Sequence, residues 1–270
     1  MRDFFAAFIL GCIEGITEFL PISSTGHLIL VHQWIKFEIH FQNMFDVVIQ
    51  LGAICAVILH FRHRFLPFGL KNGNQKNPFP SHLWLKICIG AFPALAIGFF
   101  TGNAIQSKLL VPQVVAGTLI GWGFMLILIE NHQVNKSARI HSIENLGYGT
   151  AFGIGMVQCL ALIPGTSRSA ATIIGAMLLG CSRLVAAEFS FFLAIPVMVA
   201  ASCYSLLKYG MSMNGHELLI LVIGFMTSFT IAAIVLRNFI KYVESHTFIC
   251  FGIYRIILGM AVVIMIFLAK

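Results

Sequence analysis

Long apolar stretches, separated by short polar segments, dominate the pattern of this sequence. Each of six stretches approaches the roughly 20 residues that an α-helix needs to cross the hydrocarbon core of a bilayer. The pattern therefore predicts membrane-spanning helices near residues 44–61, 83–100, 111–130, 184–207, 218–236 and 248–268.

Two further apolar regions, 4–35 and 147–181, do not have the pattern of a simple span. A polar cluster that begins with proline interrupts each of them: Pro21-Ile-Ser-Ser-Thr-Gly-His27 in the first and Pro164-Gly-Thr-Ser-Arg-Ser169 in the second. Backbone groups freed by such a break inside a membrane must be satisfied by protein or water. We interpret both regions as re-entrant helical hairpins whose tips meet at the membrane midplane.

The composition excludes a soluble globular protein. Of the 270 residues, 59% are hydrophobic and only 10% are charged, whereas a soluble domain usually carries about 25% charged residues. We therefore expect a single polytopic membrane domain over residues 1–270, of the all-α class. The net charge is +7, but the Lys and Arg residues form no run or stripe, so nucleic acid is not an expected partner.

A faint internal repeat relates the two halves of the chain. Glu14 precedes Pro21 as Gln158 precedes Pro164, and each stands three residues after a glycine. Each half would contain one hairpin and three spans, and an odd number of crossings forces the second copy to be inverted. Many transporters build an anion site from broken helices in such inverted repeats. The expected fold is an inverted-topology repeat of about six full spans plus two re-entrant helical hairpins, with approximate halves 1–135 and 140–270.

The basic residues favour one orientation in the membrane. If both termini are outside, the cytoplasmic side collects ten Lys and Arg residues and the outer side five. Cytoplasmic loops usually carry the excess of Lys and Arg, so we predict an N-out and C-out topology. The cytoplasmic group is Arg62, Arg64, Lys71, Lys76, Lys86, Lys136, Arg139, Arg183, Arg237 and Lys241; the outer group is Arg2, Lys36, Lys108, Lys208 and Lys270.

Two carboxylates in the first hairpin are candidates for chemistry. Glu14 and Glu18 lie four residues apart, so they share one face of a helix. Ionisable residues within apolar segments are functional candidates by default. The pair could hold a divalent cation such as Mg²⁺ or Ca²⁺, share a proton, or act as a general acid or base. The structural alternative is a pair of carboxylates at the water-exposed end of a helix. No nucleotide-binding motif is present, so no organic cofactor is expected.

The polar cluster after Pro21 could form the first turn of a half-helix. Ser23, Ser24 and Thr25 would then offer hydroxyl groups and unpaired N–H groups at the positive end of the helix dipole, which suits an anion. His27 stands one turn beyond Ser24, and we expect it to lie within reach of the Ser24 hydroxyl as a base beside a nucleophile. The structural alternative is a plain N-cap followed by an interfacial histidine.

The second polar cluster adds a cation. Ser167 and Ser169 supply donors, and Arg168 offers a forked guanidinium that suits two phosphate oxygens. An arginine inside an apolar segment needs a partner, and an ion pair with Glu14 or Glu18 is the structural alternative. If the two tips face each other, they form an anion pocket equipped for phosphoryl chemistry.

At these residues the sequence resembles the bacterial undecaprenyl-diphosphate phosphatases, which are bacitracin-resistance proteins. The matching segments are Glu14-Gly-Ile-Thr-Glu-Phe-Leu-Pro-Ile-Ser-Ser-Thr-Gly-His27 and Pro164-Gly-Thr-Ser-Arg-Ser-Ala-Ala-Thr172. The resemblance implies a hydrolase that removes the terminal phosphate of undecaprenyl diphosphate and regenerates the lipid monophosphate carrier for cell-wall peptidoglycan synthesis. It also implies a multi-pass protein of the bacterial cytoplasmic (inner) membrane with a site open to the periplasmic or outer face. The functional positions carried over by motif are Glu14, Glu18, Ser24, His27, Ser167, Arg168 and Thr172.

The sequence thus leads to a specific hypothesis. Ser24 attacks the terminal phosphorus with His27 as base, while Glu14 and Glu18 position His27, hold Mg²⁺ or Ca²⁺, or do both. Within the family, attack by the histidine is the competing version. The alternative function is a polyprenyl-phosphate transporter or flippase without bond cleavage. Membrane lipid is an expected partner, and a homodimer is compatible with the sequence. The expected diphosphate-binding residues are Arg168, Ser167, Ser169, Thr172, Thr25 and Ser23.

Overall fold

The structure, a computed structural model, confirms an all-α multi-pass membrane protein and describes residues 1–65, 80–133, 138–210 and 213–268. Six of the described helices are long and apolar enough to cross a membrane. Each coincides with a predicted span, and most continue beyond it because polar residues at the membrane surface prolong the helix. The six are α3 (Ile39–His60), α5 (Pro80–Leu109), α6 (Pro112–Gln133), α9 (Arg183–Tyr209), α10 (Gly215–Ser245) and α11 (Ile249–Leu268).

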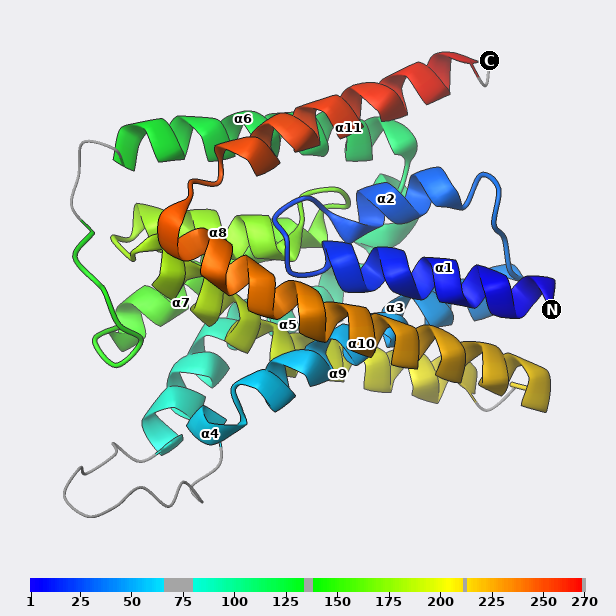
Figure 1. Ribbon diagram of the computed structural model, residues 1–270, viewed down its shortest axis with the longest axis horizontal. Helices are drawn as coiled ribbons and strands as arrows, with labels where there is room; N and C mark the ends of the chain where they lie inside the picture. The colour runs from blue at the N-terminus through cyan, green and yellow to red at the C-terminus, as the bar shows by residue number, and fades with distance from the viewer. Residues whose placement is uncertain (66–79, 134–137, 211–212, 269–270) are drawn as a thin grey trace.

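Shorter helices occupy the two interrupted regions. Helices α1 (Arg2–Thr17) and α2 (Ser24–Val31) flank the first polar cluster. The second cluster is flanked by α7 (Tyr148–Gln158), the short 3₁₀ helix η1 (Cys159–Leu162) and α8 (Arg168–Leu178), and α4 (Arg62–Phe65) follows α3. Figure 1 shows α1 running inward from the end with the N-terminus and α2 returning toward that end. The turns at both polar clusters lie near the middle of the long axis, as the hairpin interpretation predicts.

The N-terminus and the end of α11 lie at the same end of the long axis (Figure 1). The connection from α2 to α3 and the ends of α5 and α9 lie at this end too, and with the N-terminus they carry Arg2, Lys36, Lys108 and Lys208. The opposite helix ends and connections carry Arg62, Arg64, Lys86, Arg139, Arg183, Arg237 and Lys241. Lys71, Lys76, Lys136 and Lys270 of the predicted charge groups lie outside the described residues.

Helix α9 lies at the centre of the packed helices. It contacts α3, α5, α8 and α10, and it has the most buried membrane window of the six candidate spans. Helices α6 and α11 pack against each other along their length. Both also contact the hairpin helix α2, and α6 contacts α8. The two hairpins are therefore enclosed by spanning helices, which supply partners for the backbone at their tips.

Packing around the hairpins has a matched pattern in the two halves. The first helix of the first hairpin, α1, packs on α10, and the first helix of the second hairpin, α7, packs on α5. A glycine permits the close approach in both places: Gly11 lies against the backbone carbonyl of Gly224, and Gly155 against that of Gly90. A Cβ atom at Gly11 or Gly155 would overlap with that carbonyl oxygen, so only glycine allows these helices to pack so closely.

Candidate active site

Each hairpin tip ends in a serine that caps the following helix. The Ser23 hydroxyl accepts a hydrogen bond from the N–H of Gly26, and that of Ser167 accepts one from Ala170, both at 3.3 Å. In the part of the chain that the structure describes, these are the only non-glycine residues with positive φ, at 73° and 69°. Such backbone strain is rare and concentrates at functional sites. The predicted start of a half-helix near Ser23 is confirmed, and the second tip has the same geometry.

A buried arginine of α11 joins the two tips. Arg255 donates to the carbonyl of Pro21 at 3.2 Å, and to the carbonyls of Gly165 and Thr166 at 2.9 Å each. Its side chain is completely buried. Backbone groups freed by the helix breaks need such partners inside a membrane. Arg255 therefore stabilises the approach of the two tips from a third element.

Two residues of α8 position the second tip. Ser169 Oγ donates to the carbonyl of Leu20 in the first tip at 3.0 Å. Thr172 Oγ1 shares a hydrogen bond of 2.6 Å with the hydroxyl of Ser190 on α9. The Ser190 carbonyl accepts a hydrogen bond from Arg168 Nη1 at 2.8 Å. Thr172 therefore acts on the guanidinium through Ser190, because it fixes the residue that orients Arg168.

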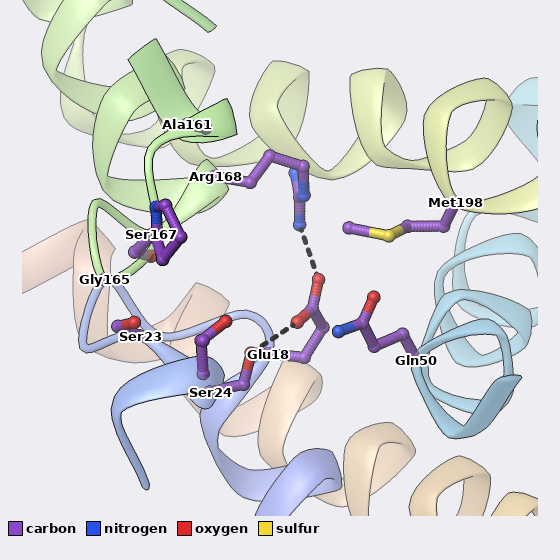
Figure 2. A pocket seen from close by; sticks show the side chains of 11 residues that line it. Glu18, Ser23, Ser24, Gln50, Ala161, Gly165, Ser167, Arg168 and Met198 are labelled. Carbon is purple, nitrogen blue, oxygen red and sulfur yellow. Dashed lines mark hydrogen bonds and ion pairs between the residues drawn. The ribbon is translucent and has the colours of Figure 1, made fainter. Parts of the chain in front are cut away.

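The tips enclose a cavity of about 190 Å³, shown in Figure 2. Pockets for drug-sized ligands usually measure about 300–1,000 Å³, so this cavity suits a small polar group rather than a long chain. Side chains of both tips, of α3 and of α9 line it. The lining residues are Glu18, Ser23, Ser24, Thr25, Gln50, Ala161, Pro164, Gly165, Ser167, Arg168 and Met198.

A chain of hydrogen bonds connects the two tips across this cavity (Figure 2). Arg168 Nη2 donates to Glu18 Oε1 at 3.3 Å, and Ser24 Oγ donates to Glu18 Oε2 at 3.1 Å. All three side chains are buried. The Glu18 carboxylate thus lies between a cation and a hydroxyl. This arrangement supplies a nucleophile, a proton acceptor beside it, and a donor for an anion.

Glu14 lies one helical turn before Glu18 and does not line the cavity. Its side chain is completely buried, and neither carboxylate oxygen has a hydrogen-bond partner in the structure. Buried carboxylate oxygens are costly unless a cation or a proton satisfies them. Glu14 therefore fits either a proton shared with Glu18 or a divalent cation held together with Glu18. The described residues contain no cluster of three or more metal-ligating side chains, so these two carboxylates are the protein ligands available here.

Among the described residues, no hydrogen bond joins the side chains of His27 and Ser24, although His27 was expected within reach of the Ser24 hydroxyl. The hydroxyl of Ser24 donates to Glu18 instead. His27 Nδ1 lies 2.8 Å from the carbonyl oxygen of Ser23, and Nε2 lies 2.7 Å from the hydroxyl of Tyr254 on α11. The imidazole ring of His27 instead bonds to the backbone carbonyl of the helix cap and to a residue from the second half of the chain. Sequence spacing alone could not show that these two groups, rather than the Ser24 hydroxyl, are the hydrogen-bond partners of His27.

Residues 7–261 match the family model described as bacitracin resistance protein BacA. The chain belongs to this family. An undecaprenyl-diphosphatase of Enterococcus faecalis is 45% identical over 261 residues, which cover 94% of each chain. An undecaprenyl-diphosphatase of Desulfitobacterium hafniense is 46% identical over 265 residues, 97% of this chain and 95% of the relative. Undecaprenyl-diphosphatase 1 of Clostridium acetobutylicum is 45% identical over 261 residues, 96% of this chain and 95% of the relative.

The family match covers both hairpin tips, and the structure brings most of the predicted site residues together. The predicted residues that line the cavity are Glu18, Ser23, Ser24, Thr25, Ser167 and Arg168; those that do not are Glu14, His27, Ser169 and Thr172.

Gln50, Arg255, Met198 and Tyr254 lie at or around the cavity and are not among the predicted site residues. Gln50 and Arg255 carry a recognisable signal, because each is a polar residue inside a long apolar segment. Met198 and Tyr254 carry none, since methionine and tyrosine are common in such segments. Only the folded structure brings Met198 to the cavity and Tyr254 to His27.

Proposed function

We propose that this protein is an undecaprenyl-diphosphate phosphatase, which removes the terminal phosphate and leaves undecaprenyl monophosphate. The monophosphate is the carrier used in cell-wall peptidoglycan synthesis. The names of the relatives support the reaction and the substrate. The observation that carries the proposal is the chain of Arg168, Glu18 and Ser24 within one cavity between two helix N-termini.

The cavity has the charge and size expected for the diphosphate group. Arg168 presents a buried guanidinium whose Nε has no hydrogen-bond partner in the structure. The first turns of α2 and α8 add the positive ends of two helix dipoles. The apolar polyprenyl chain does not fit a cavity of about 190 Å³. We expect that chain to remain in the bilayer or in a lateral groove while the diphosphate enters.

In the first step, Ser24 Oγ attacks the terminal phosphorus. Its proton passes to Glu18 Oε2, which already accepts a hydrogen bond from this hydroxyl. The bond between the terminal phosphorus and the bridging oxygen breaks, and the bridging oxygen leaves with its electron pair as part of undecaprenyl monophosphate. Glu18, rather than His27, is therefore the proton acceptor in our proposal, because the geometry favours it.

In the second step, water attacks the phosphorus of the phosphoserine. The bond between phosphorus and Ser24 Oγ breaks, and inorganic phosphate leaves. As this bond breaks, Ser24 Oγ takes back the proton that Glu18 accepted in the first step, so Glu18 is again a carboxylate, and the protons of the water leave with inorganic phosphate or pass to solvent. Throughout both steps, Arg168 and the helix N–H groups stabilise the negative charge on the transferring phosphoryl group, which is the main means of catalysis for this type of transfer.

A divalent cation is part of the proposal but not of the steps above. Glu14 and Glu18 would hold Mg²⁺ or Ca²⁺, since the Glu14 oxygens have no other partner. A bound cation would help to neutralise the diphosphate oxygens.

We also propose the orientation and the origin of the fold. In the described chain, seven basic residues lie at helix ends and connections opposite the termini and four lie on the side of the termini. This bias supports N-out and C-out in the bacterial inner membrane, with the site open to the periplasmic or outer face. The paired contacts of α1 with α10 and of α7 with α5 support halves 1–135 and 140–270 as inverted copies.

Release of inorganic phosphate from undecaprenyl diphosphate by purified protein in detergent tests this function. Wild type should release phosphate, and Ser24→Ala should reduce the rate by at least about 10³-fold because it lacks the nucleophile. Ser202→Ala is the matched control, since Ser202 is buried on α9 and donates to the carbonyl of Val47. A folded wild type that releases no phosphate, with or without added cation, would contradict the proposal and favour lipid transport without cleavage.

A further inference from the structure

His27 and Tyr254 form a closely fitted pair between the two halves of the chain. Tyr254 Oη lies 2.7 Å from His27 Nε2. The two rings are stacked, with centroids 5.6 Å apart and an interplanar angle of 11°. His27 Nδ1 lies 2.8 Å from the carbonyl oxygen of Ser23. Both ring nitrogens of His27 are thus engaged, and one face of the ring is covered.

These contacts fix the protonation pattern of the neutral ring. A carbonyl oxygen can only accept, so Nδ1 must carry a proton and donate it to Ser23. Nε2 of the neutral imidazole then has a free lone pair, which accepts the hydroxyl proton of Tyr254. Without the tyrosine hydroxyl, nothing in the structure would hold Nε2.

The neighbouring residue on α11 shows that this region of the helix supports the site. Arg255 holds the carbonyls of both hairpin tips. Tyr254 is 42% exposed, so its hydroxyl is not buried for the sake of packing. Two successive residues of α11 therefore contact the tips, and each makes a different type of contact.

We propose that Tyr254 is a positioning residue for His27 in the phosphatase reaction. The inference rests on the proposed function. The tyrosine hydroxyl and ring hold the imidazole as the Nδ1–H tautomer with Nε2 facing Tyr254. In this position the Nδ1–H of His27 holds the carbonyl of Ser23, and with it the turn that carries Ser24, and His27 is not the base of Ser24. Loss of the hydroxyl frees the ring to rotate and to change tautomer, which lowers the fraction of molecules ready to react.

Tyr254→Phe tests this role, because phenylalanine keeps the stacked ring and removes only the hydroxyl. We expect kcat to fall about tenfold, a part of the roughly 10²-fold that a small misplacement of the reacting groups can cost, while KM changes less than about twofold. The pH–rate profile should lose or shift the limb that belongs to His27. Tyr148→Phe is the matched control, because Tyr148 makes a 2.9 Å hydrogen bond to His82 away from the site; this variant should behave as wild type.

A double-mutant comparison separates positioning from general structural support. In a His27→Gln background, Tyr254→Phe should cause no further loss of kcat, because the residue that Tyr254 positions is already absent. An equal loss in both backgrounds would overturn the proposal. Wild-type kcat and an unchanged pH profile in Tyr254→Phe would also overturn it.

A spectroscopic readout makes the result independent of turnover. Nitrogen-15 NMR of histidine-labelled protein, with the His27 signals assigned by difference from His27→Gln, should show the Nδ1–H tautomer in wild type and a changed pattern in Tyr254→Phe. An Nε2–H tautomer in wild type would overturn the inference whether or not the protein releases phosphate. Absence of phosphate release with the expected tautomer would contradict the proposed function while the His27–Tyr254 geometry stands.

Discussion

The two hairpin tips have the same backbone geometry but carry different side chains. Both break at a proline, both use a serine with positive φ as helix cap, and both begin a half-helix in the centre of the molecule. The residue after the cap is Ser24 in the first tip and Arg168 in the second. One tip therefore supplies a hydroxyl, and the other supplies a cation.

The same divergence extends to the helices that lead into the tips. Glu14 and Gln158 occupy corresponding positions, each three residues after a glycine that touches a neighbouring helix. Both side chains are buried without hydrogen-bond partners in the structure. The comparison shows two similar helix N-termini that carry different side chains, with a carboxylate and a hydroxyl in the first hairpin and a cation in the second.

After loss of the Ser24 nucleophile itself, the largest effect should come from removing the cation of the second tip. Arg168→Ala should lower the turnover for phosphate release by about 10²–10³-fold or more, which is typical of a lost electrostatic contact in the transition state. It also leaves the buried carboxylate of Glu18 without its ion pair. Steady-state phosphate release measures the effect, with Arg62→Ala, an exposed arginine of α4, as control. Turnover within a factor of two of wild type would remove Arg168 from the site.

The next largest effect should come from substitution of Glu14, a carboxylate that the second hairpin replaces with Gln158. Glu14→Gln makes the first tip resemble the second, and it should raise the cation concentration needed for half-maximal activity by about 10–100-fold, a range typical of altered metal-site partners. Phosphate release titrated with Mg²⁺ or Ca²⁺ after chelation provides the measurement. Glu244→Gln, at an exposed carboxylate of α10, is the control. An unchanged titration curve would exclude Glu14 as a ligand.

Substitution of either cap serine should have a smaller effect, and this effect should be of the same size at both tips. Ser23→Ala and Ser167→Ala should each lower the free energy of unfolding by about 1–2 kcal/mol, because alanine loses the cap hydrogen bond and retains the positive φ. Ser23→Gly and Ser167→Gly should cost less, since glycine tolerates this conformation. Apparent melting temperatures in detergent compare the four variants. A large cost at one tip only would contradict their common geometry.

The apolar runs and the proline breaks were sufficient to predict the six spans and the two hairpins, because run length is a physical requirement of the bilayer. The meeting of the tips followed from the placement of Arg168 and the carboxylates. The strained caps could not be predicted, since Ser23 and Ser167 stand where glycine would be expected. The partner of His27 could not be predicted either, because Tyr254 lies far along the chain and becomes a neighbour only through tertiary packing.

The smallest predicted effect lies at the outer end of the first hairpin. His32 Nε2 pairs with Asp46 at 2.8 Å. Burial alone would lower the pKa of His32, but the hydrogen bond and the negative charge of Asp46 outweigh it, so the pKa is raised above its ordinary value. The stabilising contribution is therefore complete below the ordinary pKa of about 6.5 and is lost as the pH rises through the raised value.

His32→Gln checks this pair. The variant should melt a few degrees below wild type at low pH, and the difference should shrink as the pH rises through the raised pKa of His32. Melting temperatures across a pH series provide the data. His132→Gln, at an exposed histidine near the end of α6, serves as control. A difference that grows with pH would show that the sign of the coupling is opposite to the one inferred here.

Transfer of the phosphoryl group to Ser24 is the central claim. The most direct test mixes wild type with undecaprenyl diphosphate labelled in its terminal phosphate, quenches with acid within one turnover, and maps the label by peptide mass spectrometry. We predict label on Ser24 in wild type and none at this position in Ser24→Ala, which should also be inactive. An unlabelled Ser24 together with near wild-type phosphate release by Ser24→Ala would contradict the account and show that another group or water attacks phosphorus.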